Sequence, residues 1–537
     1  MEVSVTNVDV VVTDSRGNRV RDLAATEFEI LEDGKPQELS NFLFVDEDQA
    51  FTPGLSPESG VRPPLPEPGV LTPAVPRPVA KVTVFIDVLH IVPANRVRVL
   101  RALEEFLNSR LGPNAEAMIV TLDRALRPRG PFTRDARALG AVLAGIAEEA
   151  TPGAGTYVQR QRLFREIDQA AQADSRSRNT LFDSAILTVR SYSENVRYDT
   201  EATLNGVRVT LGRLSGVEGR KVLILVSEKL SYSPGFEVWE YLRAALRSVG
   251  MSDQRPDIPQ LGGSEYDERP KARALAEAAN AANVTLYTFD AAGLGFEIHT
   301  SAEFGGLDTA VDTATSTVLD ESMLQALADE TGGVAAIRRN DVSAVLKELE
   351  QDWRTYYSLG YATPPKRENR PRAVTVRVRR PGLKVRTRHA VLERSADARL
   401  AEQVSSALFF PREQNPLDAR IEIGRLKKSG KSTYVAPLSV RIPRAHLTLV
   451  REGNRLRGGF VFAAAVRAPD DRYTDVSQKR VAVDVPASDA AGTFLFETTF
   501  EVRPGRQVFS VALVDEISRT TSFLQPEVNL GARDAPR

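Results

Sequence analysis

The feature that most constrains the fold of this chain is an alternation of apolar runs with helix-like segments between residues 81 and 355. The runs KVTVFIDV, AEAMIVTLD, KVLILVSE and VTLYTFD are almost continuously apolar, as strands are when both faces of a sheet are covered. Segments such as ANRVRVLRALEEFLNSRL place apolar residues at helical spacing. The pattern predicts an α/β fold with a doubly wound, mostly parallel sheet, interrupted by a helical insert at 155–215.

A different, β-type pattern precedes and follows this region. Residues 1–48 alternate apolar and polar side chains and contain an Asp33-Gly34 hairpin signal, so they predict an N-terminal β module. We expect it to pack against strands at 356–394, because neither group alone is large enough to bury a core. Nine prolines between 49 and 80 predict an extended linker.

The last part of the chain also favours β structure. A polar connector at 395–417 leads into many short alternating segments at 418–537, and their spacing predicts a β-sandwich. The predicted division is therefore a β module at 1–48, a linker at 49–80, the α/β domain at 81–355, a β extension at 356–394, a connector at 395–417 and a sandwich at 418–537.

Composition excludes several classes of protein. The 537 residues carry a net charge of −1, which argues against a dedicated nucleic-acid binder. The chain has no cysteine, so disulfides, thiol catalysis and zinc–cysteine sites are excluded. No apolar run is long enough to predict a transmembrane segment, and the first residues lack the pattern of a signal peptide. Sequence signatures of serine hydrolases, phosphate loops and zinc proteases are absent, so we expect a protein that is not an enzyme.

Three acids follow predicted strands of the α/β domain: Asp87, Glu228 and Asp290. Ligands of open parallel sheets bind outside the carboxyl ends of the strands. Asp87 and Glu228 are therefore candidates to converge, with a loop hydroxyl, on one divalent cation such as magnesium, which prefers oxygen ligands. For Asp290 the pattern favours a turn or a helix cap.

In this order of elements, residues 81–355 resemble a von Willebrand factor A (VWA) domain. The chain to about residue 392 also resembles the VWFA-related proteins known mainly from Acidobacteria. That resemblance rests on NVDVVVTDSRGNRVRDLAATEFEILEDGKPQELSNF, SPGF, TFDAAGLG and LADETGGVAAIRRNDVSAVLKELEQDWRTYYSLGY. VWA domains carry a metal-ion-dependent adhesion site with an Asp-x-Ser-x-Ser motif, a threonine before a helix, and an aspartate after a later strand.

The resemblance implies a degenerate form of this metal site. FIDVLHI supplies Asp87 but places Leu89 and Ile91 at the serine positions, RNTLFDSAI supplies Thr180, and LVSEKLS supplies Ser227 and Glu228. Magnesium retains several waters, so water could replace missing ligands. The implied metal ligands are Asp87, Thr180 and Glu228.

Histidine chemistry has few candidates, because the chain contains only His90, His299, His389 and His446. His90 lies close to Asp87 and could be a ligand or a base. Since magnesium prefers oxygen and no second histidine is near, the sequence favours a packing or surface role for His90. The other three are assigned no role.

The predicted function is protein–protein interaction or adhesion through the top of the VWA-like sheet, with a protein ligand and with magnesium as an optional cofactor. Members of the related family typically look exported, so the resemblance implies a secreted, periplasmic or cell-surface protein. Two alternatives stay open. One is a metal-independent structural module in which the C-terminal sandwich binds, and the other is a hydrolase that uses acidic residues.

Overall fold

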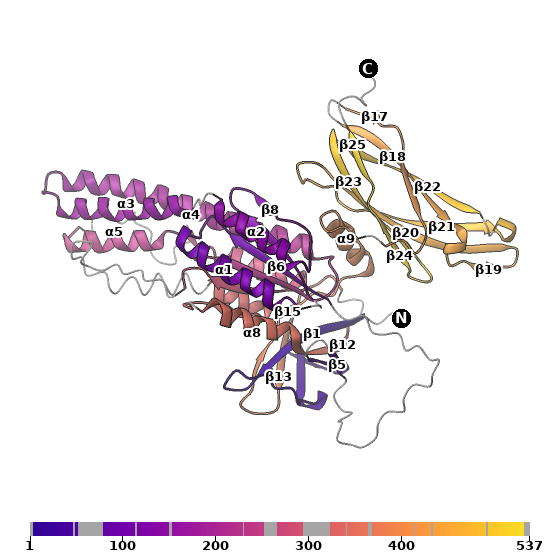
Figure 1. Cartoon of the computed structure of the whole chain (residues 1–537), viewed down its shortest axis with the longest axis horizontal. Coiled ribbons are helices and arrows are strands. Elements are labelled where there is room, and N and C mark those ends of the chain that lie inside the picture. Colours follow the sequence, from indigo (N-terminus) through magenta and orange to yellow (C-terminus); the bar gives the residue numbers. More distant parts are fainter. Residues whose placement is uncertain are drawn as a thin grey trace. The chain divides into compact units, whose positions relative to one another are not determined.

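The chain folds into two compact units in the computed structural model (Figure 1). The first unit combines Met1–Leu211 with Gly219–Glu393, and the second combines Gly212–Glu218 with Arg394–Arg537. The structure describes residues 4–46, 49–51, 79–112, 115–149, 153–228, 230–251, 266–293, 323–339, 341–363, 368–412, 414–430, 433–489 and 492–530. Most of the linker predicted at 49–80 lies outside these described residues.

A six-stranded sheet forms the centre of the α/β region. Its order is β11-β10-β9-β6-β7-β8, and all neighbouring strands are parallel except β7 and β8. The strands are β6 (Ala80–Asp87), β7 (Ala115–Leu122), β8 (Leu126–Pro128), β9 (Lys221–Ser227), β10 (Val284–Asp290) and β11 (Ala335–Ala336). The chain order reverses between β6 and β9, which makes this pair the topological switch point where ligands bind in such sheets.

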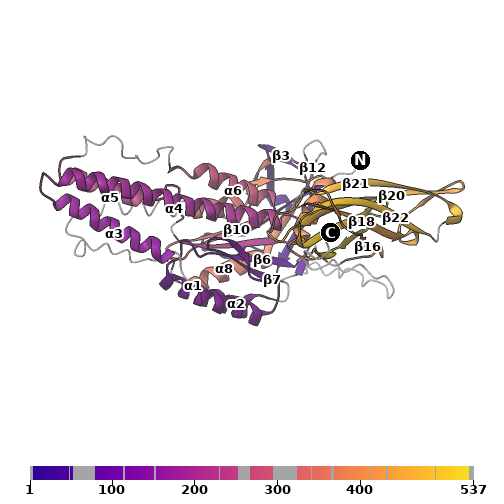
Figure 2. The same ribbon diagram turned by 90° about the horizontal axis from the view of Figure 1, so that it is seen from above.

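Helices cover both faces of this sheet, as the sequence predicts (Figure 2). α1 (Pro93–Arg110), α2 (Ala136–Glu148) and α8 (Val342–Arg354) share one hydrophobic core with Val82, Val84 and Ile86 of β6. α4 (Arg178–Leu214) and α6 (Arg269–Ala281) cover the other face. Because side chains alternate along a strand, Phe85 and Asp87 point toward α4.

A helical arm extends from the sheet (Figure 1). It consists of α3 (Gly153–Gln172), the first part of α4, and α5 (Phe236–Ser248). Its core includes Phe164, Phe182 and Trp239. The sequence predicts several separate helices at 155–215, whereas the structure has one continuous helix of 37 residues after α3.

The N-terminal strands and the strands after α8 form one sandwich. One sheet contains β14 (Lys384–Arg386), β1 (Ser4–Thr13), β12 (Thr355–Thr363), β4 (Leu39–Asp46) and β5 (Gln49–Phe51). The other contains β15 (Ala390–Val391), β13 (Arg372–Val378), β2 (Phe28–Glu32) and β3 (Lys35–Gln37). The two sheets share a core that includes Val10, Phe28, Tyr357 and Val374. Each sheet combines N-terminal strands with later strands, and each buries the apolar face of the other.

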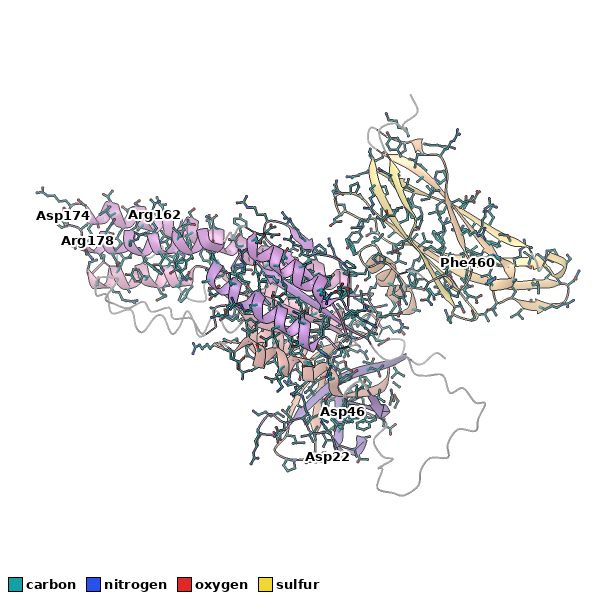
Figure 3. The ribbon with its side chains drawn as sticks, viewed as in Figure 1. Asp22, Asp46, Arg162, Asp174, Arg178 and Phe460 are labelled. Atoms are coloured by element: carbon teal, nitrogen blue, oxygen red, sulfur yellow. The ribbon has the colours of Figure 1, made fainter. Side chains whose placement is uncertain are left out.

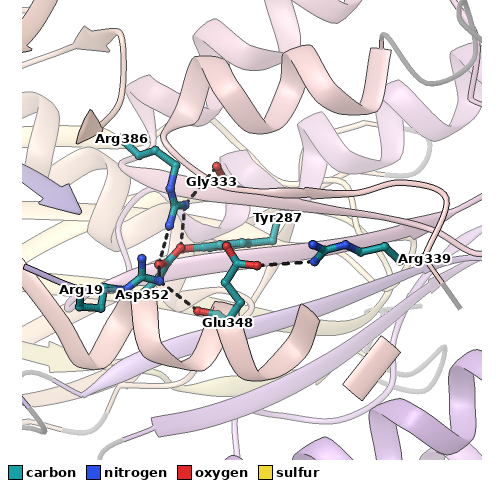
Figure 4. A network of polar contacts seen from close by, with 7 residues as sticks. All are labelled: Arg19, Tyr287, Gly333, Arg339, Glu348, Asp352 and Arg386. Carbon is teal, nitrogen blue, oxygen red and sulfur yellow. Dashed lines mark hydrogen bonds and ion pairs between the residues drawn. The ribbon is translucent and has the colours of Figure 1, made fainter. Parts of the chain in front are cut away.

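Asp352 connects this sandwich to the α/β sheet (Figure 4). The residue is fully buried on α8. Its carboxylate accepts hydrogen bonds from Arg386 at 2.7 and 2.8 Å, from the Tyr287 hydroxyl of β10 at 2.9 Å, and from Arg19. Burial alone would lower the pKa of Arg386, but the charge and hydrogen bonds of Asp352, together with smaller contributions from Tyr287 and Glu348, raise that pKa. One carboxylate thus joins three segments that are distant in sequence.

The second unit is a β-sandwich covered by one helix. One sheet contains β16 (Arg420–Ile423), β17 (Lys427–Lys428), β18 (Tyr434–Pro443) and β22 (Thr493–Val502). The other contains β19 (Val450–Glu452), β20 (Arg455–Arg467), β21 (Ser477–Pro486), β23 (Gly505–Asp515), β24 (Thr521–Leu524) and β25 (Glu527–Leu530). Phe460, labelled in Figure 3, lies in the core between them.

The connector predicted at 395–417 is part of this unit, because α9 (Ala396–Ala407) packs on the second sheet through Leu400 and Val404. Within the described ranges, no helix combines the length and apolar character needed to cross a membrane.

We expect Asp352→Ala to lower the free energy of unfolding of the first unit by about 3 to 5 kcal/mol. It leaves Arg19, whose side chain is 7% exposed, and the partly buried Arg386 without their counter-charge. Denaturant unfolding of the full chain, followed by tryptophan fluorescence, measures this effect. Both tryptophans of the chain, Trp239 and Trp353, are buried in the first unit.

Glu348→Gln is the matched control. Glu348 lies one turn earlier on α8, and its side chain forms an exposed ion pair with Arg339 at 3.6 Å. Its backbone carbonyl, which accepts a hydrogen bond from Arg19, is unchanged by the substitution, so the loss of the charge should cost less than about 1 kcal/mol. Equal effects of the two substitutions would show that Asp352 has no special role at this junction.

Candidate functional site

The side chain of Asp87 is the centre of the candidate site. It ends β6 and is completely buried. One carboxylate oxygen, Oδ2, accepts hydrogen bonds from the Ser227 hydroxyl at 2.6 Å, the His90 Nδ1 at 2.7 Å and the Thr203 hydroxyl at 3.1 Å. A buried carboxylate is costly unless it is paired and hydrogen-bonded. These three donors meet that requirement for Oδ2, whereas the buried Oδ1 has no hydrogen-bond partner among the described residues.

The fold explains why these groups meet. β6 and β9 are parallel neighbours, with Ile86 opposite Val226, so Asp87 and Ser227 are the next positions at the same end of the sheet. α4 crosses this region closely at Gly206, where an added Cβ would lie 3.2 Å from Leu122 and 3.3 Å from Phe85. Thr203 is one turn earlier on α4, which places its hydroxyl beside Asp87.

The loop after β6 presents His90 rather than its neighbours to Asp87. Leu89 and Ile91, which occupy the expected serine positions, are only 8% and 0% exposed. Ile91 belongs to the core beneath α1. Because these two apolar side chains turn inward, the residue between them faces the carboxylate. The His90 side chain is itself only 8% exposed, so its packing role is combined with a polar contact that the sequence did not reveal.

Glu228 lies near this group but contacts a helix. It is 4% exposed, and its Oε2 accepts a hydrogen bond from the backbone N–H of Val92 at 3.1 Å. Val92 precedes the first turn of α1 and has no side chain that could cap it. A carboxylate is favourable at a helix N-terminus, so Glu228 supplies the missing cap.

The structure does not bring Thr180 to Asp87. Thr180 is exposed in the first turn of α4, two residues after Arg178, which lies at the outer end of the arm (Figure 3). Thr203 follows 23 residues later (203 − 180), about 35 Å along the axis at ~1.5 Å per residue. The sequence motif places Thr180 just before a helix, whereas α4 already begins at Arg178 and brings the hydroxyl of Thr203 to Asp87.

A sequence signal for Thr203 does exist. Thr200, Thr203 and Thr210 are all buried on α4, and their spacings of three and seven residues place them on one helix face. Buried polar residues on the inward face of a helix that leads into a central strand indicate that this face contributes to the site. The pattern predicts Thr203 only if residues 178–214 form one continuous helix.

Nearby carboxylates affect the pKa of the His90 ring. Burial would lower its pKa, but Asp87, and to a smaller extent Asp199 and Glu228, outweigh burial and raise the pKa above 6.5. Asp199 lies one turn before Thr203 and is partly buried. Burial raises the pKa of the Asp199 carboxyl, and the opposing effect of the nearby His90 only partly offsets this rise. The surrounding carboxylates therefore make the His90 ring easier to protonate than a free histidine.

These residues do not fit the predicted magnesium site. Two ligand positions are inward-facing apolar residues, Thr180 lies on the arm, and the Glu228 carboxylate binds a helix end. No group of three or more acidic or histidine side chains in the described part of the chain could hold a metal ion. The oxygens that do converge belong to Asp87, Thr203 and Ser227.

Other predicted residues have structural roles where they are described. Asp290 accepts a hydrogen bond from the Ala292 N–H at 3.0 Å, the turn that the sequence predicts. His389 is exposed beside Glu330, and His446 contacts the Pro416 carbonyl. His299 lies outside the described residues.

Comparisons with known proteins give only distant likenesses. No family model and no curated protein matches the chain. Similar solved structures include an aerotolerance-related membrane protein from Bacteroides fragilis (TM-score 0.23), BatB from Bacteroides thetaiotaomicron (0.22) and the vWF domain of the type V pili tip protein Mfa5 from Porphyromonas gingivalis (0.25). All three are 11% identical to this chain, and each alignment covers 51% of it. The alignments cover 98%, 97% and 94%, in the same order, of the other three chains. Values this low assign neither a family nor a function.

We expect the stabilising effect of His90 to decrease as pH rises. The folded-state pKa of His90 is raised, so the charged pair with Asp87, supported by Asp199 and Glu228, contributes fully below about 6.5 and is lost as pH passes the folded value. Unfolding free energies of wild type and His90→Gln, measured from pH 6 to 9, test this expectation. The difference between the two proteins should shrink toward high pH, and a difference that grows would contradict a raised pKa.

Proposed function

We propose that this chain is a non-enzymatic protein-interaction module of the VWA type, which binds a protein partner at the carboxyl ends of β6 and β9. The supporting observation is the convergence of Asp87, Thr203 and Ser227 at the switch point of the sheet. The VWA adhesion site that the sequence resemblance implies also combines an acid with hydroxyl groups at this end of the sheet.

A metal-independent mode of binding agrees best with the local contacts. Asp87 Oδ2 already accepts three hydrogen bonds, and Glu228 caps α1. We therefore propose that the partner contacts the protein surface of the surrounding loops and not a bound magnesium ion. An exported location, which the family resemblance implies, belongs to the same proposal.

The carboxylates also argue against the hydrolase alternative. A glycosidase-type mechanism needs two carboxyl groups that face a bound substrate. Asp87 is 0% exposed and Glu228 is 4% exposed, and both accept hydrogen bonds from the protein itself. Neither is presented to a substrate, which counts against a hydrolase of this kind.

Site-specific photo-cross-linking in the full chain tests the location of binding. A photo-reactive residue at Ala94, exposed at the start of α1 beside the candidate site, should cross-link a protein partner from the source cells. The same residue at Glu277, exposed on α6 near the amino end of β10, is the control and should not. Cross-linking of the same partner from Glu277 alone would contradict the proposed surface.

Once the partner is purified, its affinity for the full chain should be the same in the presence of EDTA and of magnesium. A large loss of affinity in EDTA would show that binding depends on a metal.

A further inference from the structure

We propose that the His90 side chain occupies the place of the divalent cation in this VWA-like site. A built-in imidazole would then hold the acid and the two hydroxyls that a metal ion would otherwise hold. The inference rests on the proposed function only for the comparison with a VWA metal site, and it is tested without a partner protein.

The first support is the chemistry of the converging oxygens. Asp87 contributes a carboxylate, and Thr203 and Ser227 contribute hydroxyls within 3.1 and 2.6 Å of it. Carboxylate and hydroxyl oxygens are the kind of hard ligand that magnesium prefers. β6, α4 and β9 therefore bring together part of an oxygen cage.

The second support is the position of the ring. His90 Nδ1 lies 2.7 Å from Asp87 Oδ2 and 3.4 Å from the Thr203 hydroxyl oxygen. A magnesium ion would need to approach its oxygen ligands to about 2.0–2.1 Å. The ring contacts the same two oxygens from hydrogen-bonding distance, so it fills the space on which such an ion depends.

The third support is that the loop is fixed in this orientation. Leu89 and Ile91 are buried on either side of His90. A Cβ at Gly153, which begins α3, would lie 2.9 Å from the Ile91 carbonyl oxygen and 3.0 Å from that of Leu89. The absence of a side chain at residue 153 thus lets α3 pack directly on the backbone of the loop. This contact leaves His90 little freedom to turn away from Asp87.

Two buried polar atoms of this pair agree with the replacement. Asp87 Oδ1 and His90 Nε2 are both buried without a hydrogen-bond partner within the described residues. The buried carboxylate therefore keeps one oxygen that could bind a cation once the ring is removed.

The inference predicts that removing the ring reopens a cation site. In the full chain, His90→Ser should gain one Mn²⁺ site, measured as the loss of the free Mn²⁺ signal by electron paramagnetic resonance, and Mg²⁺ should compete for it. Wild type should show no such site. His389→Ser, which removes an exposed histidine elsewhere in the same unit, is the control and should behave like wild type. Adding Asp87→Asn to His90→Ser should abolish the gain.

Folding of the variant is checked by the fluorescence of the two buried tryptophans. If His90→Ser is unfolded in EDTA, Mn²⁺ should restore the folded signal, and His90→Gly provides a second test. A variant that neither binds Mn²⁺ nor is rescued by it overturns the inference but leaves the proposed interaction surface intact. A wild-type Mn²⁺ site that Asp87→Asn removes overturns both this inference and metal-independent binding.

Discussion

The burial of one carboxylate, that of Asp87, is the constraint on which the candidate site depends. A charged group with no exposed surface must be neutralised or surrounded by donors, and three elements at this end of the sheet donate hydrogen bonds to it. The loop after β6 provides His90, α4 provides Thr203, and β9 provides Ser227. The switch point of the sheet brings these elements together, so the site is a direct product of the strand order.

A second buried carboxylate secures the same unit at its junction with the sandwich. Asp352 joins α8 to Tyr287 of β10 and to two arginines, Arg19 before β2 and Arg386 of β14. Since the α/β sheet and the N-terminal sandwich meet at this group, the sandwich is a structural part of the unit. The arm formed by α3, α4 and α5 is supported differently, by an apolar core of its own.

Most of the fold could be predicted from residue patterns. Near-continuous apolar strands such as KVLILVSE require cover on both faces, and alternation in residues 1–48 requires a partner sheet. The site was harder to predict, because Asp87 could be placed at a strand end but its donors could not. His90 faces Asp87 only because Leu89 and Ile91 are buried, and this outcome depends on tertiary packing. A local sequence motif predicts Thr180, whereas Thr203 is the residue that reaches the site. It does so on a helix whose full length the spacing of apolar residues does not reveal.

The central claim is that the His90 ring, and not a metal ion, is bonded to Asp87. Long-range ¹H–¹⁵N correlation spectra of the full chain labelled with ¹⁵N-histidine test this directly, because only four histidines contribute signals. The account predicts a slowly exchanging Nδ1 proton on His90 that is unchanged by added Mg²⁺ and disappears in Asp87→Asn. A His90 Nδ1 that carries no proton, or a signal that Mg²⁺ displaces, would contradict it.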